Sequence, residues 1–119
     1  MERINIAEKF ALFRETWSPK VIGELNGQHV KLARIEGEFE WHHHDDEDEL
    51  FLVIDGEMVM HYRDRDVVLR PGELVIVPRG VEHKPASADG AQILLFEPAS
   101  TLNTGNVTSD RTVEAPEWI

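Results

Sequence analysis

Three histidines precede a run of acidic residues in the segment WHHHDDEDEL, residues 41–50. In an extended chain successive side chains point to opposite faces, so His42 and His44 share one face while His43 takes the other. Along a strand the Cα atoms of His42 and His44 would lie about 6.6 Å apart, a spacing at which two imidazoles can converge on one ion. The segment therefore allows two interpretations, a site for a divalent metal or a solvated cluster of charges.

The residues around these histidines have a regular spacing. Four residues separate Gly37 from His42, four separate His44 from Glu49, and six separate Glu49 from Gly56. A second group has a glycine, five residues, Pro-x-Gly, two residues and a histidine, and it consists of Gly72, Pro78, Gly80 and His83. A pair of histidines alone is weak evidence for a metal, but the two groups together form a more specific signal.

The two groups resemble the two signature motifs of the cupin superfamily. The first motif is a glycine, His-x-His, three or four residues, a glutamate, six residues and a glycine, and the second has the spacing seen from Gly72 to His83. The chain departs from these motifs in two places, with four residues instead of five before His42 and with Ser87 where asparagine is frequent. Neither departure changes a ligand position. The pattern looks most like the small single-domain cupins labelled as similar to mannose-6-phosphate isomerase.

The resemblance implies a metal centre with four ligands, which are His42, His44, Glu49 and His83. Three imidazoles and one carboxylate suit a divalent transition ion such as Zn, Fe, Mn, Ni or Cu. Burying these groups in an apolar barrel without an ion would be expensive, although an ion-free barrel whose histidines hydrogen-bond one another is the alternative. The acids of residues 45–48 are expected to form a solvated loop.

Short alternating segments surround these residues. Asn26-Gly27 between two such segments predicts a type I′ hairpin over residues 20–36. Further strands are expected over FEWHHH, LFLVI, EMVMHY, VVLR, LVIVP and AQILLFE. No long helical stretch separates these segments, which argues against βαβ units. The pattern predicts an all-β sandwich or closed barrel, and the resemblance implies the double-stranded β-helix, or jelly-roll, of a cupin.

The length of 119 residues predicts a single cupin domain over residues 1–119. Asn5 as N-cap, with Glu8 three residues later, predicts a short N-terminal helix. The core barrel is expected over about residues 20–97. Residues 98–119 are rich in Ser, Thr, Asn and Pro and are predicted to form an extended C-terminal arm whose apolar last residues dock on the barrel.

Composition excludes several classes of function. The chain has no cysteine, so disulfides, thiolate nucleophiles and cysteine-bound zinc are absent. Twelve Lys and Arg against 23 Asp and Glu give a net charge of −11, which repels nucleic acid and anionic membranes. No apolar run approaches the ~20 residues of a membrane span, and the N-terminus lacks a signal-like segment. We therefore expect a cytoplasmic protein that binds neither nucleic acid nor membrane.

The segment LFLVI is apolar on both of its faces. Phe51 and Val53 share one face, while Leu50, Leu52 and Ile54 share the other. The interior of a small barrel takes up one face, and the second must be covered by the terminal segments or by another subunit. The pattern predicts a homodimer.

Several residues are candidates for the wall of a pocket. Phe51 has the same parity as Glu49 and is expected to face the metal site. Lys31, Arg34 and Arg79 are candidates to bind an anionic substrate, but alternation does not fix their direction before the strand register is known.

Two classes of function agree with these residues. The first is a metalloenzyme that acts on a small polar metabolite, either as an isomerase of a sugar or sugar phosphate or as a dioxygenase. Isomerisation needs a base near the metal, for which Lys31, His61 and Glu97 are candidates. The alternative is a non-catalytic cupin that binds a small ligand or has a structural role. The sequence leaves the metal and the substrate open.

Overall fold

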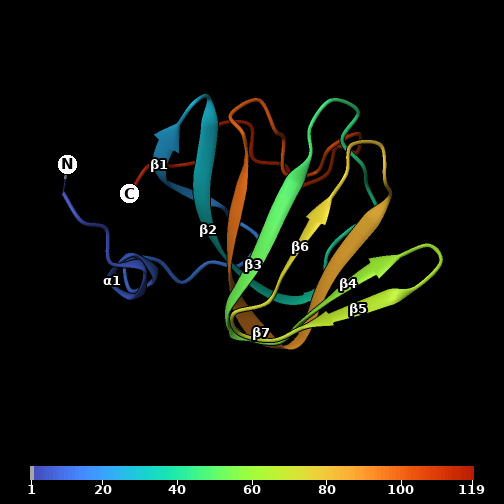
Figure 1. Ribbon diagram of the computed structural model, residues 1–119, viewed down its shortest axis with the longest axis horizontal. Helices are drawn as coiled ribbons and strands as arrows, with labels where there is room; N and C mark the ends of the chain where they lie inside the picture. The colour runs from blue at the N-terminus through green and yellow to red at the C-terminus, as the bar shows by residue number, and fades with distance from the viewer. Residues whose placement is uncertain (1) are drawn as a thin grey trace.

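The computed structural model describes residues 2–119 and is built almost entirely from antiparallel strands (Figure 1). A short helix, α1 (Ile6–Phe10), precedes them. Its N-cap is Asn5, whose side chain accepts a hydrogen bond of 2.9 Å from the backbone N–H of Glu8. This bond satisfies one of the free N–H groups of the first turn. The predicted helix and its cap are confirmed.

The strands of the described part of the chain form a jelly-roll barrel. They are β1 (Lys20–Leu25), β2 (Gln28–Glu38), β3 (Glu49–Gly56), β4 (Met58–Tyr62), β5 (Asp66–Leu69), β6 (Leu74–Val77) and β7 (His83–Pro98). Five strands pair in the order β1-β2-β7-β3-β6, while β4 pairs with β5 and β7. The 16 residues of β7 pair with β2, β3 and β4, which joins the two halves of the barrel. The predicted all-β jelly-roll fold is confirmed.

The first hairpin forms where the sequence predicts it. Asn26 and Gly27 connect β1 to β2 with φ values of 51° and 76°. Positive φ at both central residues defines the type I′ turn, whose twist matches that of the paired strands.

Two apolar clusters hold the fold together. Inside the barrel, Phe51 and Val53 from β3 are almost fully buried. Outside the sheet, Phe10 and Phe13 pack on Leu32 of β2. Burial of each such side chain contributes about 1.5–3 kcal/mol. The N-terminal segment therefore covers part of the outer face of the sheet.

The outer face of β3 and β6 is only partly covered. Leu50 and Leu52 pair in register with Ile76 and Leu74. Ile76 is 59% exposed and Leu74 is 51% exposed. The apolar residues of β3 therefore alternate as predicted, and these four side chains form an apolar outer face.

The end of the chain docks on β1, as the sequence predicts. Val21 donates its backbone N–H to Glu117 O at 2.8 Å and accepts that of Ile119 at 3.0 Å. Lys9 of α1 donates from Nζ to Ile119 O at 2.7 Å. Both termini therefore lie on the same side of the barrel, beside α1 and β1 (Figure 1).

The strand predicted over FEWHHH does not form. Residues 39–48 are irregular apart from a single bridge between His42 and His83. The alternation of side chains nevertheless persists, because His42 and His44 are buried while His43 is half-buried. In the described residues no helix is long and apolar enough to span a membrane.

Candidate metal centre

Four side chains from three parts of the chain meet inside the barrel. His42 and His44 come from the irregular segment, Glu49 begins β3 and His83 begins β7. Each is at most 4% exposed. Each offers one ligand atom, and these atoms all lie within 4.8 Å of one another. This buried group has the residue types and the proximity needed to hold a metal ion.

Two of the imidazoles have a defined tautomer. Nδ1 of His42 lies 2.8 Å from Glu40 O, and Nδ1 of His83 lies 2.9 Å from Val81 O. A carbonyl oxygen only accepts, so each Nδ1 carries a proton, and in the neutral form of such a ring Nε2 has the lone pair that can bind a metal. Burial and the neighbouring His83 lower the pKa of His42 to about 4, so His42 is neutral at neutral pH. Such backbone bonds orient histidines for metal binding.

The free ring nitrogens face a carboxylate. Nε2 of His83 lies 3.1 Å from Oε1 of Glu49, and Nε2 of His44 lies 2.8 Å from the same oxygen. Despite this short distance, the buried Nε2 of His44 makes no hydrogen bond. Lone pairs that face one another repel unless a proton or a cation lies between them, and a divalent ion would satisfy all of them. The residues present therefore fit a metal ion.

A second carboxyl group lies beside Glu49. Nζ of Lys31 donates to Oε1 of Glu97 at 2.9 Å, and both residues are 2% exposed. Burial and the charge of Glu49 raise the pKa of Glu97 well above its usual range. Burial opposes ionisation of Glu49, but a hydrogen bond with Glu97 is the largest contribution that lowers its pKa, which lies well below the usual range. The Glu97 carboxyl group therefore keeps its proton to a higher pH than the Glu49 carboxyl group.

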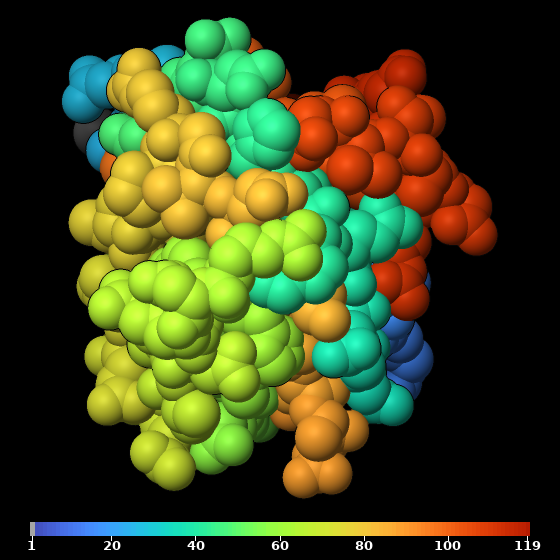
Figure 2. All heavy atoms as spheres, turned by 90° about the vertical axis from the view of Figure 1, so that its right-hand side faces the viewer, coloured from blue at the N-terminus to red at the C-terminus, as the bar shows by residue number. Residues whose placement is uncertain are grey.

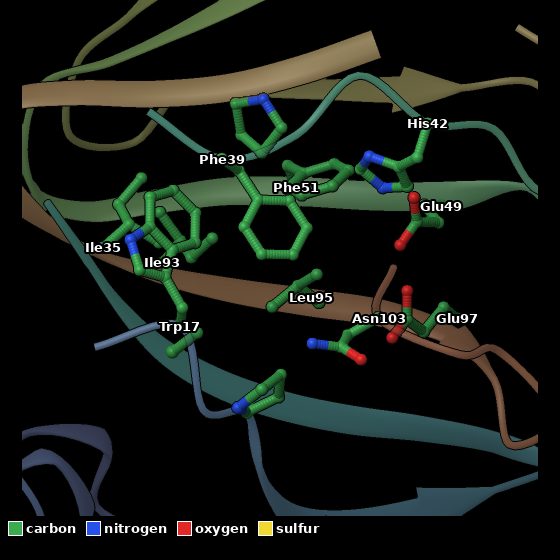
Figure 3. Close-up of a pocket in the computed structure, with 13 residues that line it drawn as sticks. Trp17, Ile35, Phe39, His42, Glu49, Phe51, Ile93, Leu95, Glu97 and Asn103 are labelled. Carbon is green, nitrogen blue, oxygen red and sulfur yellow. The ribbon is translucent and has the colours of Figure 1, made fainter. Parts of the chain in front are cut away.

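The buried His42 and Glu49 side chains, together with Glu97, border a narrow cavity inside the barrel (Figure 3). Its volume is about 40 Å³, which is room for about three water molecules. The polar end is formed by His42, Glu49, Glu97 and Asn103, and the rest of the wall includes Trp17, Ile35, Phe39, Phe51, Ile93 and Leu95. Trp17 and Phe39 stack with their ring centroids 4.8 Å apart. The cavity therefore combines a flat apolar wall with one polar end.

Phe51 lines the cavity, as alternation along its strand predicts. Lys31 also points into the barrel, but its ammonium group lies behind Glu97 and does not belong to the cavity wall. The register of β2 places Lys31 there, because Lys31 pairs with Leu95 of β7, which lines the cavity. The next residue of β2, Leu32, faces the other side of the sheet. Lys31 therefore contacts the site only through Glu97.

The prediction that Arg79 lines the pocket is corrected. The Arg79 side chain is 62% exposed, and its backbone N–H and Nε donate to Asp48 Oδ1 at 2.8 and 3.3 Å. This contact with the acidic loop holds the guanidinium on the surface. Arg34 likewise lies elsewhere, where it donates to the carbonyl oxygens of Phe10 and Phe13.

The sequence does not predict most of the cavity wall, including Trp17, Phe39 and Asn103. These three residues come from the segment before β1, from the position just after β2 and from the C-terminal arm, and no local pattern relates them. Among the candidate bases, Glu97 lines the cavity. His61 instead pairs with Asp66 on the hairpin of β4 and β5, at 2.6 Å.

The chain belongs to the cupin family, because residues 28–97 match the Cupin_2 model of the cupin domain. It is similar to the crystal structure of a cupin-2 domain-containing protein from Shewanella frigidimarina, with 45% identity, a TM-score of 0.79 and coverage of 80% of this chain and 93% of that one. The jelly-roll fold and the family agree.

Two curated relatives match a shorter part of the chain. The uncharacterized protein YdbB of Bacillus subtilis is 40% identical over 67 residues, which is 56% of this chain and 59% of YdbB. A 3-hydroxyanthranilate 3,4-dioxygenase of Xanthomonas campestris is 37% identical over 60 residues, which is 47% of this chain and 34% of the enzyme. The matches therefore span less than two thirds of either relative.

Proposed function

We propose that this protein is a metal-dependent cupin enzyme that acts on a small molecule inside the barrel. His42, His44, Glu49 and His83 would bind a divalent transition ion, one of Zn, Fe, Mn, Ni or Cu. The observation that carries the proposal is the convergence of four buried ligand atoms within 4.8 Å at the polar end of a cavity. When bound, such an ion supplies Lewis-acid activation or, as iron(II), redox chemistry with dioxygen.

The wall of the cavity favours a compact substrate with a flat apolar body and one polar end. The stacked rings of Trp17 and Phe39 offer an aromatic surface. Among the described residues no lysine or arginine lines this cavity, whereas binding of a phosphate group uses such cations. The lining therefore favours a hydroxylated aromatic acid over a sugar phosphate, and a substrate of that size requires the 40 Å³ cavity to widen. The similarity to a 3-hydroxyanthranilate 3,4-dioxygenase supports dioxygenation as the reaction class.

A substrate screen tests this choice. Protein loaded with iron(II) is mixed with hydroxylated aromatic acids or with sugar phosphates, and oxygen consumption and product formation are followed. We expect oxygen uptake with the aromatic acids, with both oxygen atoms entering the product and no external reductant consumed. Isomerisation of a sugar phosphate would contradict the choice of substrate. Saturable binding without turnover would instead support the alternative, a non-catalytic ligand-binding cupin.

A substitution of Phe39 tests the role of the aromatic wall. Phe39→Leu keeps an apolar side chain but removes the stacked partner of Trp17. An aromatic pair contributes about 0.5–1.5 kcal/mol beyond its buried area, so we expect KM for the best aromatic substrate to rise about 2–10-fold. Metal content should stay unchanged, since Phe39 is not a ligand. An unchanged KM would show that the substrate does not contact this wall.

We also propose that the chain forms a homodimer through the outer face of β3 and β6. Ile76 and Leu74 lie at its exposed edge, and the face carries no charge in a chain of net charge −11. Ile76→Glu is therefore expected to convert a dimer to a monomer in light scattering, because it adds two like charges to the interface. Val68→Glu is the matched control, as Val68 is 44% exposed on β5, and it should leave the dimer intact. A monomeric wild type would contradict the proposal.

A further inference from the structure

The segment with the three histidines has no continuous strand pairing to hold it. The backbone of His42 exchanges two hydrogen bonds with His83, of 3.1 and 2.9 Å. The carbonyl of His44 accepts a hydrogen bond of 2.7 Å from Gly80 N–H. The strands of the barrel thus hold His42, and the turn before β7 holds His44. The backbone of His43, which joins them, is held by neither.

The C-terminal arm, predicted over residues 98–119 and beginning after Pro98 of β7 in the structure, holds His43 through Asn106. The backbone N–H of His43 donates to Oδ1 of Asn106 at 2.9 Å, and the backbone N–H of Asn106 donates to His43 O at 3.1 Å. In Figure 2 the orange-red arm lies directly against the teal segment that contains these histidines. One residue of the arm therefore pairs with both backbone groups of His43.

The residue before Asn106 allows this close approach. A Cβ atom built on Gly105 would lie 2.1 Å from His43 O and 3.2 Å from Cδ2 of the His42 ring. Gly105 also has a φ of 56°, in the left-handed region. Glycine is the residue that meets both requirements without strain. The arm thus contacts the backbone of His43 and the imidazole of His42 together.

The arm has its own internal structure, which gives Asn106 a fixed support. The side chain of Asn103 donates to Arg111 O and accepts from Val113 N–H, both at 2.8 Å. The hydroxyl groups of Thr104 and Thr112 lie 2.7 Å apart, and Thr104 is fully buried. These bonds close residues 103–113 into a compact loop. The position of Asn106 is therefore fixed by hydrogen bonds within the arm.

The loop also borders the cavity. Asn103 lies in the cavity wall (Figure 3), and the guanidinium of Arg111 lies 5.5 Å from the ring of Trp17 and 5.8 Å from that of Phe39. Nη1 of Arg111 donates to Glu38 O at 2.7 Å. All of these arm residues follow residue 97, where the match to the cupin domain ends.

We infer that Asn106 is a positioning residue for the metal centre, whose side chain holds His42 and His44 in converging orientations by accepting the hydrogen bond from His43 N–H. This inference rests on the metal site proposed above. Groups that orient metal ligands typically change metal affinity about 10–100-fold when they are removed. Asn106 contacts no proposed ligand atom, so its effect on the metal is exerted through the backbone.

Metal affinity in the full-length protein tests this role. Zn²⁺ is competed against a chromophoric chelator, and the unfolding midpoint of the metal-free protein is measured in parallel. We expect Asn106→Ala to weaken Zn²⁺ binding about 10-fold. Asn106→Asp keeps the oxygen that accepts from His43 N–H, so it should bind Zn²⁺ at least as tightly as the wild type. Ser109→Ala is the matched control, because it removes only a 3.1 Å bond within the arm, and its affinity should not change.

The outcomes separate this inference from the metal site itself. If Asn106→Ala matches the affinity of a wild type that binds Zn²⁺, the positioning role is wrong and the metal site stands. If Ser109→Ala weakens binding as much as Asn106→Ala, the effect belongs to the stability of the arm and the specific role of Asn106 is also wrong. If the wild type binds no ion, the metal site itself is wrong.

Discussion

Replacing His83 with alanine is expected to abolish stoichiometric binding of a divalent transition ion. His83 is fully buried, its Nδ1–H is held by Val81 O, and its Nε2 lies 3.1 Å from Oε1 of Glu49. The substitution removes one of the four proposed ligand atoms, which is a larger change than the loss of an orienting group. We therefore expect metal affinity to fall by more than about 100-fold. Chelator competition and metal content after gel filtration measure the loss.

The fold should survive this substitution, because the bridge between His83 and His42 uses backbone atoms. Circular dichroism checks that it does. His61→Ala is the control, since His61 contacts Asp66 on the hairpin of β4 and β5 and should leave metal binding unchanged. Wild-type affinity in a folded His83→Ala variant would remove His83 from the ligand set.

Lys31→Met is expected to destabilise the metal-free protein by about 3–5 kcal/mol. The ammonium group of Lys31 is buried against Glu97, 2.9 Å from its Oε1, and Glu97 lies beside the carboxyl group of Glu49. Methionine has a similar length but no charge, so this buried pair of carboxyl groups loses its cation. Urea unfolding of chelator-treated protein measures the change in the free energy of unfolding.

A surface pair is the control for Lys31→Met. Lys84 lies 3.2 Å from Glu38, whose side chain is 64% exposed, and such a pair contributes about 0–1 kcal/mol. Lys84→Met should therefore have a small effect. The double variant Lys31→Met with Glu97→Leu should recover part of the lost stability, because both partners of the buried contact are then replaced by apolar groups. Equal stabilities of Lys31→Met and Lys84→Met would contradict this account of the buried pair.

The features that could be predicted from the sequence are those encoded by local spacing. Asn26-Gly27 fixes a hairpin turn through the φ values that these two residues accept. Alternation orients His42 and His44 toward one interior, whereas Glu49, an odd number of residues further on, is placed there by the spacing of the cupin motif. The cupin motifs then add His83, which is distant in sequence but has a fixed spacing from Gly72.

The features that could not be predicted depend on contacts between distant segments. Pro85 and Gly90 are residue types that commonly interrupt a strand, yet β7 runs from His83 through both of them. It does so because β4 pairs with its first residues and β2 with the rest. The exposed position of Arg79 depends on its contact with Asp48. The proposed role of the arm depends on the hydrogen bonds between Asn106 and His43, and nothing in the local sequence around either residue predicts them.

The metal content of the untagged protein, purified without chelators or a metal-affinity column, shows whether the three buried histidines and Glu49 hold an ion. Plasma mass spectrometry should find about one transition ion per chain, as expected for a single four-ligand site, and the identity of that ion selects the chemistry to screen. A protein that contains no metal, and binds none when Fe, Mn, Ni, Zn or Cu is supplied, would contradict the proposed metal site.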